Sequence, residues 1–448
     1  MQNTTQTSTL FIQITEHKKV SIAVVVISIM VMLLLHYFTG IRDIPFHPDE
    51  ASRIFCAQDF TTYLHTPFDL AWNSERSNDP LQRYRLIDSP LNNYIIGFGL
   101  LVSGEKIPTI DWSWSKTWEE NVEAGALPLP RTLFVSRMSL AVWFIVSLCL
   151  AYLTSKNLHG YLAGCIALVF AGTNSLYLLH TRRAMGEGSL LAGEYLVLYL
   201  LPKATKYPWL VGAAAGLAIC AKQSAFPIAI VAGIAILWPD EKSSKPRRAV
   251  IRHIAWNLFQ YTGIMAVIFI ILNPIYWNAP LQAIKESLVE RQKLIMAQSV
   301  DFGNNSLLVS PGKSVLGVVA NTFILPPAFA ETAQYRAYTA ASENYYLSDP
   351  VNTSLRGIFA GGIYLGFTLA GIVIAVISLK KSTWAKRRLT ALYLLAGLAQ
   401  LLFILILLPV PWQRYVIPLV PFAIIWSSLA VVTPFLHYLK NRNVPPGK

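Results

Sequence analysis

The chain has 448 residues, of which 54% are hydrophobic and 14% are charged, with a mean hydropathy of +0.45. Soluble proteins carry about 25% charged residues, so this composition excludes an ordinary soluble domain and predicts an all-α polytopic membrane protein. The net charge of +13 does not indicate nucleic acid as a partner. Residues 41–130 hold thirteen Asp and Glu against seven Lys and Arg. The basic residues elsewhere cluster between apolar spans, which is the positive-inside pattern.

The cysteines and the first apolar run give two further expectations. Three of the four cysteines fall within apolar spans and only Cys56 lies in an outer loop, which excludes a disulfide framework and a paired-cysteine metal site. The first apolar run is long enough to span and lacks a small-residue cleavage pattern after it. We therefore expect a retained helix and not a removed signal peptide.

The first span is expected over residues 20–38, and the cations before it place residues 1–19 in the cytoplasm. Residues 40–130 then form a first outer loop, which carries the acidic motif His47-Pro48-Asp49-Glu50. One helix is expected to start at Pro48, and a second after Ser89-Pro90. The second has about half of the roughly 20 residues that a span needs, so it is expected to lie along the membrane surface. Trp112, Trp114 and Trp118 are interpreted as interfacial anchors.

Residues 131–275 are expected to hold transmembrane helices 2 to 7, near 133–154, 161–180, 188–201, 208–221, 225–238 and 255–273. Residues 276–353 form a second outer loop that begins with an amphipathic helix over 281–296. Residues 315–325 are apolar but short, and stay open between a surface helix and a partial span. Residues 354–438 hold helices 8 to 10, near 355–379, 389–409 and 414–436, and residues 439–448 form a cytoplasmic tail. The chain 1–448 is thus predicted to be one integral membrane domain with about ten spans and both termini in the cytoplasm.

This topology brings ionisable groups from distant segments to the outer membrane face, namely Asp49, Glu50, Arg182, Arg183, Glu187, Lys222, Arg291 and Arg414. Most of them have a simpler alternative. The two acids after Pro48 suit a helix start, Glu187 suits a helix cap, and the arginines can reach lipid headgroups. Lys222 is harder to explain, because it lies between two apolar spans and needs a counter-ion. Cations that bind phosphate and a carboxylate that acts as a base together suit a phosphate-bearing lipid substrate.

The ordered motifs resemble the GT-C superfamily of membrane glycosyltransferases, in the protein O-mannosyltransferase and lipid A aminoarabinose transferase branch. The matching segments run in the family order: His47-Pro48-Asp49-Glu50-Ala51, Ser89-Pro90-Leu91-Asn92-Asn93-Tyr94, Arg137, residues 182–187, residues 217–224 with Lys222, residues 273–280 followed by Arg291, and Arg414-Tyr415-Val416-Ile417-Pro418. Two positions depart from the family pattern. Ser89 replaces the first proline of a Pro-Pro pair, and Asp88 stands where relatives often carry Lys or His.

The resemblance implies a GT-C-like bundle of about ten helices, with juxtamembrane helices in two long outer loops. It implies a hexosyl or pentosyl transferase that moves a sugar from a polyprenyl-phosphate donor to a lipid, glycan or protein acceptor. The membrane is expected to be the bacterial plasma (inner) membrane, with the site facing the periplasm. Asp49 is the expected general base of an inverting displacement. Lys222, Arg182, Arg183, Arg291 and Arg414 are expected to bind the donor phosphate.

Glu50 and Glu187 are expected to orient the acceptor or to hold a divalent metal, for which His47 is a third candidate ligand. No cofactor is firmly predicted, and a divalent metal stays open. The runner-up function is a transporter or flippase of lipid-linked sugars. It is disfavoured because no internal repeat is visible and because the ionisable groups lie at one face, not at the midplane. A non-catalytic scaffold leaves Lys222 and Glu187 unexplained, and adjacent acids cannot flank a sugar as in a double-displacement glycosidase.

Overall fold

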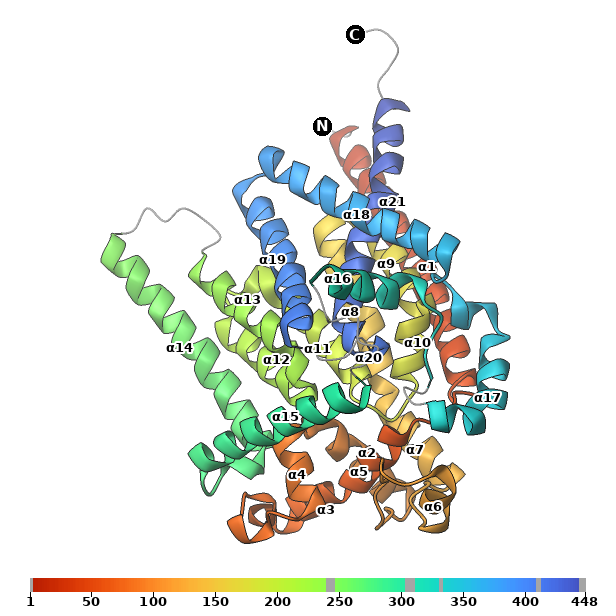
Figure 1. Ribbon diagram of the computed structural model, residues 1–448. Coiled ribbons are helices and arrows are strands. Elements are labelled where there is room, and N and C mark those ends of the chain that lie inside the picture. Colours follow the sequence, from red (N-terminus) through yellow and green to blue (C-terminus); the bar gives the residue numbers. More distant parts are fainter. Residues whose placement is uncertain (1–2, 239–245, 303–310, 330–332, 408–411, 443–448) are drawn as a thin grey trace.

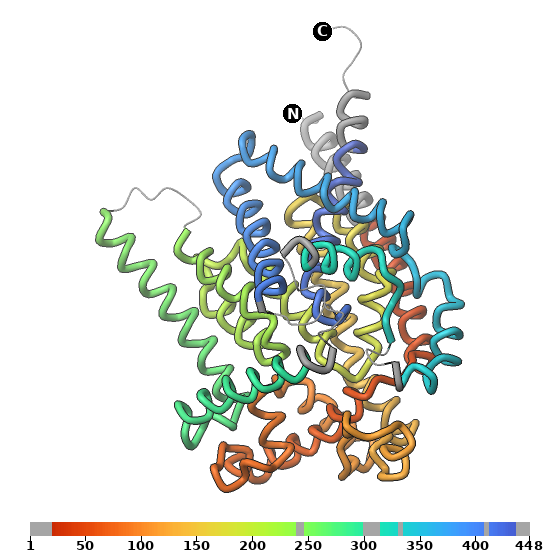
Figure 2. The backbone as a smooth tube through the Cα atoms, in the orientation of Figure 1, coloured from red at the N-terminus to blue at the C-terminus, as the bar shows by residue number. Residues whose placement is uncertain are grey.

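The computed structural model describes residues 3–238, 246–302, 311–329, 333–407 and 412–442. Helix makes up 81% of the chain, and no strand occurs in these ranges, so the predicted all-α fold is confirmed. Apolar helices stand side by side, and the segment of residues 40–130 packs against one end of them (Figure 1). The ribbon shows α1 beginning and α21 ending at the opposite end (Figure 1). The segment of residues 40–130 therefore lies away from both of these helix ends, as the backbone trace also shows for the coloured parts of the chain (Figure 2).

Six described helical segments are long and apolar enough to cross a membrane, which makes the chain a multi-pass membrane protein. They are Val20–Thr39, Pro130–His159, Arg247–Leu272, Ile358–Lys381, Trp384–Ile406 and Gln413–Phe435. The helices that form them are α1 (Asn3–Thr39), α7 (Pro130–Leu140), α8 (Val142–His159), α14 (Arg247–Leu272), α18 (Ile358–Lys381), α19 (Trp384–Leu407), α20 (Gln413–Val416) and α21 (Val420–Arg442).

A seventh candidate span is bent. The expected span 161–180 consists of α9 (Tyr161–Thr173) and α10 (Ser175–Thr181), whose axes differ by 59°. The break occurs at Asn174, which has extended backbone angles and whose side chain accepts a hydrogen bond from the Tyr177 N–H. This is an N-cap, so the polar residue ends one helix and starts the next.

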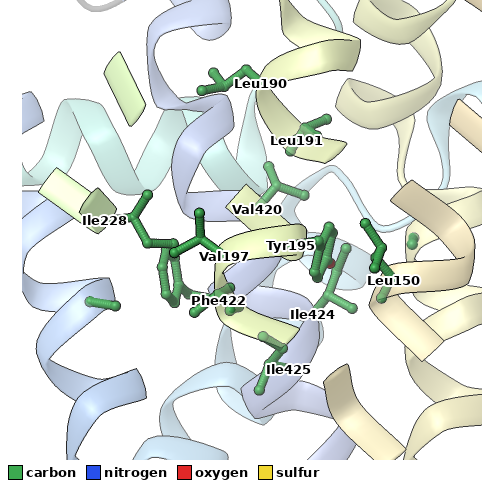
Figure 3. Packing of buried hydrophobic residues seen from close by; sticks show 14 of the residues in the cluster. Leu150, Leu190, Leu191, Tyr195, Val197, Ile228, Val420, Phe422, Ile424 and Ile425 are labelled. Atoms are coloured by element: carbon green, nitrogen blue, oxygen red, sulfur yellow. The ribbon is translucent and has the colours of Figure 1, made fainter. Parts of the chain in front are cut away.

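Three expected spans correspond to shorter helices, namely α11 (Glu187–Leu200), α12 (Pro208–Ala221) and α13 (Phe226–Leu237). Each has 12 to 14 residues, fewer than the roughly 20 that a bilayer requires. All ten apolar segments are thus helices, but the described chain has six or seven candidate spans. The centre of the core lies around α11: Leu190, Leu191, Tyr195 and Val197 pack beside Leu150 of α8, Ile228 of α13 and Val420, Phe422, Ile424 and Ile425 of α21 (Figure 3).

Residues 40–130, which we call the first outer segment after their predicted position, contain more helix than the sequence predicts. The two predicted helices are confirmed as α2 (Pro48–Cys56) and α5 (Leu91–Ser103), and α5 ends at Gly104 with a φ of +69°. The others are α3 (Gln58–His65), η1 (Pro67–Leu70), η2 (Ser74–Arg76), α4 (Pro80–Ile87) and α6 (Trp118–Glu123). Trp112 is only 2% exposed and packs with Ala51, Ala126 and Tyr335. The interfacial interpretation of Trp112 was therefore wrong, because tertiary contacts bury its ring.

The second outer segment begins with α15 (Pro280–Phe302), as predicted, and Leu281 and Leu288 leave an exposed apolar stripe on it. In Figure 1, α15 lies crosswise between the first outer segment and the membrane helices. The open stretch 315–325 falls on α16 (Pro311–Val319) and the π-helical turn η8 (Ala320–Ile324). The remaining elements are α17 (Ala333–Leu347) and the short 3-10 turns η3 (Leu201–Lys203), η4 (Gln223–Ala225), η5 (Pro274–Tyr276), η9 (Pro350–Thr353) and η10 (Ile417–Leu419).

Candidate active site

A cavity of about 2280 Å³ lies where the first outer segment meets α12, α13, α14, α15 and α20. Its ionisable lining residues include Asp49, Arg53, Asp88, Asp111, Glu187, Lys222, Glu290, Arg291 and Arg414. Its apolar wall comes mainly from the membrane helices and α15, and includes Ile219, Phe226, Met265, Phe269, Leu288 and Phe403. One cavity therefore joins a charged region to an apolar region, the combination that an amphipathic ligand requires.

The start of α2 separates the two adjacent acids. His47 is the N-cap, and its Nδ1 accepts a hydrogen bond of 3.1 Å from the Asp49 N–H. The Glu50 carboxylate reaches back and accepts from the His47 N–H at 3.0 Å, which completes a capping box. Glu50 consequently points into the protein, whereas Asp49 lines the cavity and forms an ion pair with Arg414. Arg414 lies 365 positions later in the chain.

The Glu50 side chain is 0% exposed, and it joins the start of α2 to two distant segments of the chain. Arg137 donates to both of its oxygens, each at 2.8 Å, and the Ala184 N–H donates to one of them at 2.8 Å. Burial alone would raise the pKa of this carboxyl, but Arg137, Arg183 and the Ala184 N–H outweigh it and lower the pKa of Glu50. The predicted role of Glu50 in orienting an acceptor is not supported by this position, because the carboxylate does not line the cavity.

Glu187 and Lys222 form a second charged pair at the cavity wall. The Lys222 Nζ donates to Glu187 Oε1 at 2.5 Å, so the counter-ion that Lys222 was expected to need is Glu187. Lys222 follows the last residue of α12 and has extended backbone angles. The helix is interrupted between α12 and α13, and the Lys222 side chain at this interruption lines the cavity.

Residues at the start of α5 hold the end of α12 in place. Ser89 Oγ donates to the Ile219 carbonyl at 2.8 Å, and Asn92 Nδ2 donates to the Ala221 carbonyl at 3.0 Å. Both carbonyls belong to the last turn of α12, where helical partners are missing. Ser89 is the position at which the sequence departs from the family's Pro-Pro pair, and its hydroxyl supplies a hydrogen bond that a proline cannot make.

Arg291 and Arg414 complete the cations that line the cavity. Arg291 donates to the Ile87 carbonyl and to Gln223 Oε1, the latter at 2.6 Å. The Arg414 guanidinium lies over the rings of Trp412 and Tyr415, with its carbon 4.7 and 5.3 Å from their centroids. Both guanidinium groups are thus oriented by neighbouring side chains before any ligand binds.

Arg182 and Arg183 do not line the cavity. Arg182 is 0% exposed and donates to the carbonyls of His36 and Tyr37, to Asn352 Oδ1 and to the Tyr346 hydroxyl. Arg183 donates to the carbonyls of Pro45 and Phe329. Of the eight predicted site residues, the structure brings five to the cavity, namely Asp49, Glu187, Lys222, Arg291 and Arg414. Glu50, Arg182 and Arg183 instead join buried segments.

The three candidate metal ligands are not brought together. Arg137 occupies both oxygens of Glu50, the Asp49 N–H donates to His47 Nδ1, and Lys222 pairs with Glu187. Within the described ranges, no group of three or more His, Cys, Asp or Glu side chains is arranged to hold a metal ion. The residues present therefore do not fit a metal in this conformation.

Sequence reasoning missed several cavity residues. Tyr84 donates to Asp111 Oδ2 at 2.7 Å, and Arg53 pairs with Asp88 at 2.9 Å. Burial raises the pKa of Asp111, more than the hydrogen bond from Tyr84 lowers it. No spacing in the sequence connects these residues, although Asp88 stood out as a departure from the family pattern. Asn92 stood out in the sequence only as part of a motif. A polar amide at the start of an apolar helix is the signal that could have identified it.

A comparison with protein-family models found no match, and none of the curated proteins matches the sequence. Solved structures that are similar along most of the chain include the following two. One is ArnT from Cupriavidus metallidurans bound to undecaprenyl phosphate, with 11% identity and a TM-score of 0.49 over 91% of this chain and 60% of that one. The other is the oligosaccharyltransferase AglB from Archaeoglobus fulgidus in complex with an inhibitory peptide and a dolichol-phosphate, with 12% identity and a TM-score of 0.47.

The AglB comparison covers 94% of this chain and 52% of AglB, so the chain spans little more than half the length of these proteins. Both are members of the GT-C superfamily, the class that the sequence motifs resemble. We derive a function from the residues of the cavity.

Proposed function

We propose that the protein is a membrane glycosyltransferase that moves a hexosyl or pentosyl group from a polyprenyl-phosphate donor to an acceptor at the outer membrane face. The observation that carries the proposal is the pairing of Asp49 with Arg414 inside a cavity that also contains Lys222 and Arg291. A base for an acceptor hydroxyl and cations for a phosphate are thus available in one cavity.

The lining accounts for both parts of the donor. Lys222, Arg291 and Arg414 supply the charge-assisted hydrogen bonds that a phosphate prefers. Phe226 of α13 and Leu288 of α15 line the same cavity and are 51% and 68% exposed, so its apolar wall offers accessible apolar surface. A polyprenyl chain can lie along this wall in the bilayer while its phosphate reaches the cations.

The chemistry is a single displacement. The acceptor oxygen attacks the anomeric carbon of the donor and loses its proton to Asp49, while the bond from that carbon to the phosphate oxygen breaks. The electron pair of the broken bond stays on the phosphate, which leaves as an anion and needs cations more than it needs a general acid. One displacement inverts the anomeric centre. Arg414 pairs with Asp49. A bound phosphate would compete for Arg414, so we expect donor binding to make the carboxylate available as a base.

The proposed setting is a bacterial plasma membrane with the cavity facing the periplasm and both termini in the cytoplasm. Labelling an introduced cysteine in the Glu105 turn of cysteine-free protein with a membrane-impermeant reagent on whole cells checks this orientation. Labelling only after lysis would place the cavity on the cytoplasmic side and contradict this part of the proposal.

Turnover with purified protein tests the function. Protein in detergent or nanodiscs is supplied with a panel of polyprenyl-phosphate sugars, and release of free polyprenyl phosphate is measured with and without acceptors. We expect acceptor-dependent release with at least one donor. The rival function is a transporter or flippase of lipid-linked sugars, which would move the donor across a liposome bilayer without breaking its sugar–phosphate bond. Flipping without release would overturn the enzyme proposal.

A further inference from the structure

An exposed indole stands beside the helix that carries Asp49. Trp114 lines the cavity and is 38% exposed, in contrast to the buried Trp112 two residues before it. Its ring lies 6.2 Å from the His47 ring, centroid to centroid, and His47 caps the helix that begins beside Asp49. An aromatic face is therefore available to a ligand next to the helix start that carries the proposed base.

The loop that carries Trp114 is held in place. The Ser113 N–H donates to Asn121 Oδ1 at 2.8 Å, and Asn121 Nδ2 returns a hydrogen bond to the Ser113 carbonyl at 3.0 Å. The Tyr335 ring touches Trp114, Trp112 and Trp118, with centroids 5.7, 5.5 and 6.0 Å away. The indole is thus oriented by its surroundings before a ligand arrives, which is what a binding platform requires.

Polar groups accompany this platform. The Asp111 carboxylate lines the cavity and accepts a hydrogen bond from the Tyr84 hydroxyl at 2.7 Å. A carboxylate can accept several hydrogen bonds, so Asp111 can also bind a ligand hydroxyl. Short polar side chains line the same cavity, namely Ser77, Asn78, Asp79, Ser113 and Ser115.

We propose that the acceptor is a carbohydrate, bound with the C–H face of a sugar ring on Trp114 and with its hydroxyls toward Asp111. This inference rests on the proposed function and deepens it by naming the acceptor class. The negative face of an indole attracts the C–H groups of a sugar ring, and carboxylates accept hydrogen bonds from its hydroxyls. Asp79 and Asp111 both line this cavity and can accept hydrogen bonds from sugar hydroxyls.

The position of Trp114 assigns it to the acceptor and not to the donor. Lys222 and Arg291 belong to the end of α12 and to α15, whereas Trp114 belongs to the aromatic group around Trp118 of α6. Asp49 pairs with Arg414, and His47, which caps the helix that carries Asp49, lies beside Trp114. We therefore place the donor phosphate at the cations and the acceptor at the indole.

Acceptor kinetics test the inference. Three acceptor classes are compared with the same active donor: neutral tetrasaccharides of glucose, mannose or galactose, a Ser/Thr-rich peptide, and a phosphorylated glucosamine disaccharide. We expect transfer to a tetrasaccharide. Trp114→Ala should raise the KM for that acceptor about tenfold or more and leave the KM for the donor within about twofold, because it removes an aromatic contact from one substrate only. Trp114→Phe should recover most of the affinity, since a phenyl ring keeps the aromatic face.

Trp209→Ala is the matched control, because Trp209 is 51% exposed at the start of α12 and does not line the cavity. Tetrasaccharide binding is measured separately by quenching of tryptophan fluorescence in each variant. Transfer only to the peptide or to the phosphorylated disaccharide would overturn the inference and leave the glycosyltransferase proposal standing. Trp114-dependent quenching without any release of polyprenyl phosphate would support the carbohydrate site and overturn the glycosyltransferase proposal. Quenching that is absent, or unchanged by Trp114→Ala, would overturn the carbohydrate site.

Discussion

Arg137 donates to both carboxylate oxygens of Glu50 at 2.8 Å, across 87 positions of the chain. This pair adjoins the proposed base in the sequence, because Asp49 and Glu50 are consecutive residues whose side chains leave the first turn of α2 in different directions. One acid of the motif therefore faces the cavity and the other fastens α2 to α7. Substitution of Asp49 should therefore reduce activity, whereas substitution in the Glu50–Arg137 pair should reduce stability.

Asp49→Asn should reduce transfer by a factor of roughly 10² to 10⁴, the usual contribution of a general base. The thermal unfolding temperature should change little, because the amide keeps the size of the side chain and Asp49 is partly exposed at the cavity. Release of polyprenyl phosphate and the unfolding temperature are measured on the same preparation. Transfer near the wild-type rate would show that Asp49 is not the base.

Arg137→Gln should destabilise the protein by about 3–5 kcal/mol, because it leaves the buried charge of Glu50 without its partner. The double variant Glu50→Gln with Arg137→Gln should recover part of this loss, since it removes both charges. Thermal unfolding of the single and double variants in detergent measures the difference. Equal unfolding temperatures in the wild type, Glu50→Gln, Arg137→Gln and the double variant would show that the pair contributes nothing to stability.

The pKa of Glu50 sets the direction of a pH effect. Its pKa is lowered in the folded protein from the ordinary value of 4.5 by Arg137 and its other partners. The stability that this carboxylate contributes is therefore fully present above about pH 4.5 and is lost as the pH falls through the folded-state pKa. The unfolding temperature should fall on acidification below pH 4.5, and it should fall less steeply in Glu50→Gln. A parallel fall in both proteins would assign the acid sensitivity to other groups.

Arg291 and Arg182 were both predicted to bind phosphate, and the structure separates them. Arg291→Gln should raise the KM for the donor about tenfold, equivalent to about 1.4 kcal/mol, with a small change in unfolding temperature. Arg182→Gln should lower the unfolding temperature, because it leaves buried acceptors such as Asn352 Oδ1 and the Tyr346 hydroxyl without a donor, and the KM of the remaining folded enzyme should stay near wild type. The reverse pattern would move the phosphate site to the α10–α11 turn.

Ser89→Ala should raise the KM for the donor severalfold, because it removes the hydrogen bond that holds the Ile219 carbonyl and with it the turn of Lys222. The loss of one such bond corresponds to about 0.5–1.5 kcal/mol. Ser103→Ala is the matched control on α5, since Ser103 Oγ also donates at 2.8 Å but to Gly99 of its own helix. Equal kinetics of the two variants would remove Ser89 from the positioning of Lys222.

The sequence by itself determined the membrane class and most of the helices. Apolar length defines spans, and local chemistry defines where helices begin, as Pro48 after His47 does for α2 and Pro280 does for α15. These signals are local, because a cap or an apolar stripe depends on residues within a few positions. For the same reason the sequence alone shows that the apolar stretches of α12 and α13, on either side of Lys222, are short.

Only the tertiary structure decided which polar residues share the cavity. The sequence does not show which of Arg182 and Arg291 reaches the cavity: Arg182 follows an apolar stretch, and Arg291 lies within the amphipathic helix α15. Their difference lies in what packs against them: buried carbonyls and the Asn352 amide surround Arg182, whereas Arg291 faces an open cavity. The contacts between Asp49 and Arg414 and between Glu50 and Arg137 join distant segments, so only folding of the whole chain shows which acid is free to act as a base.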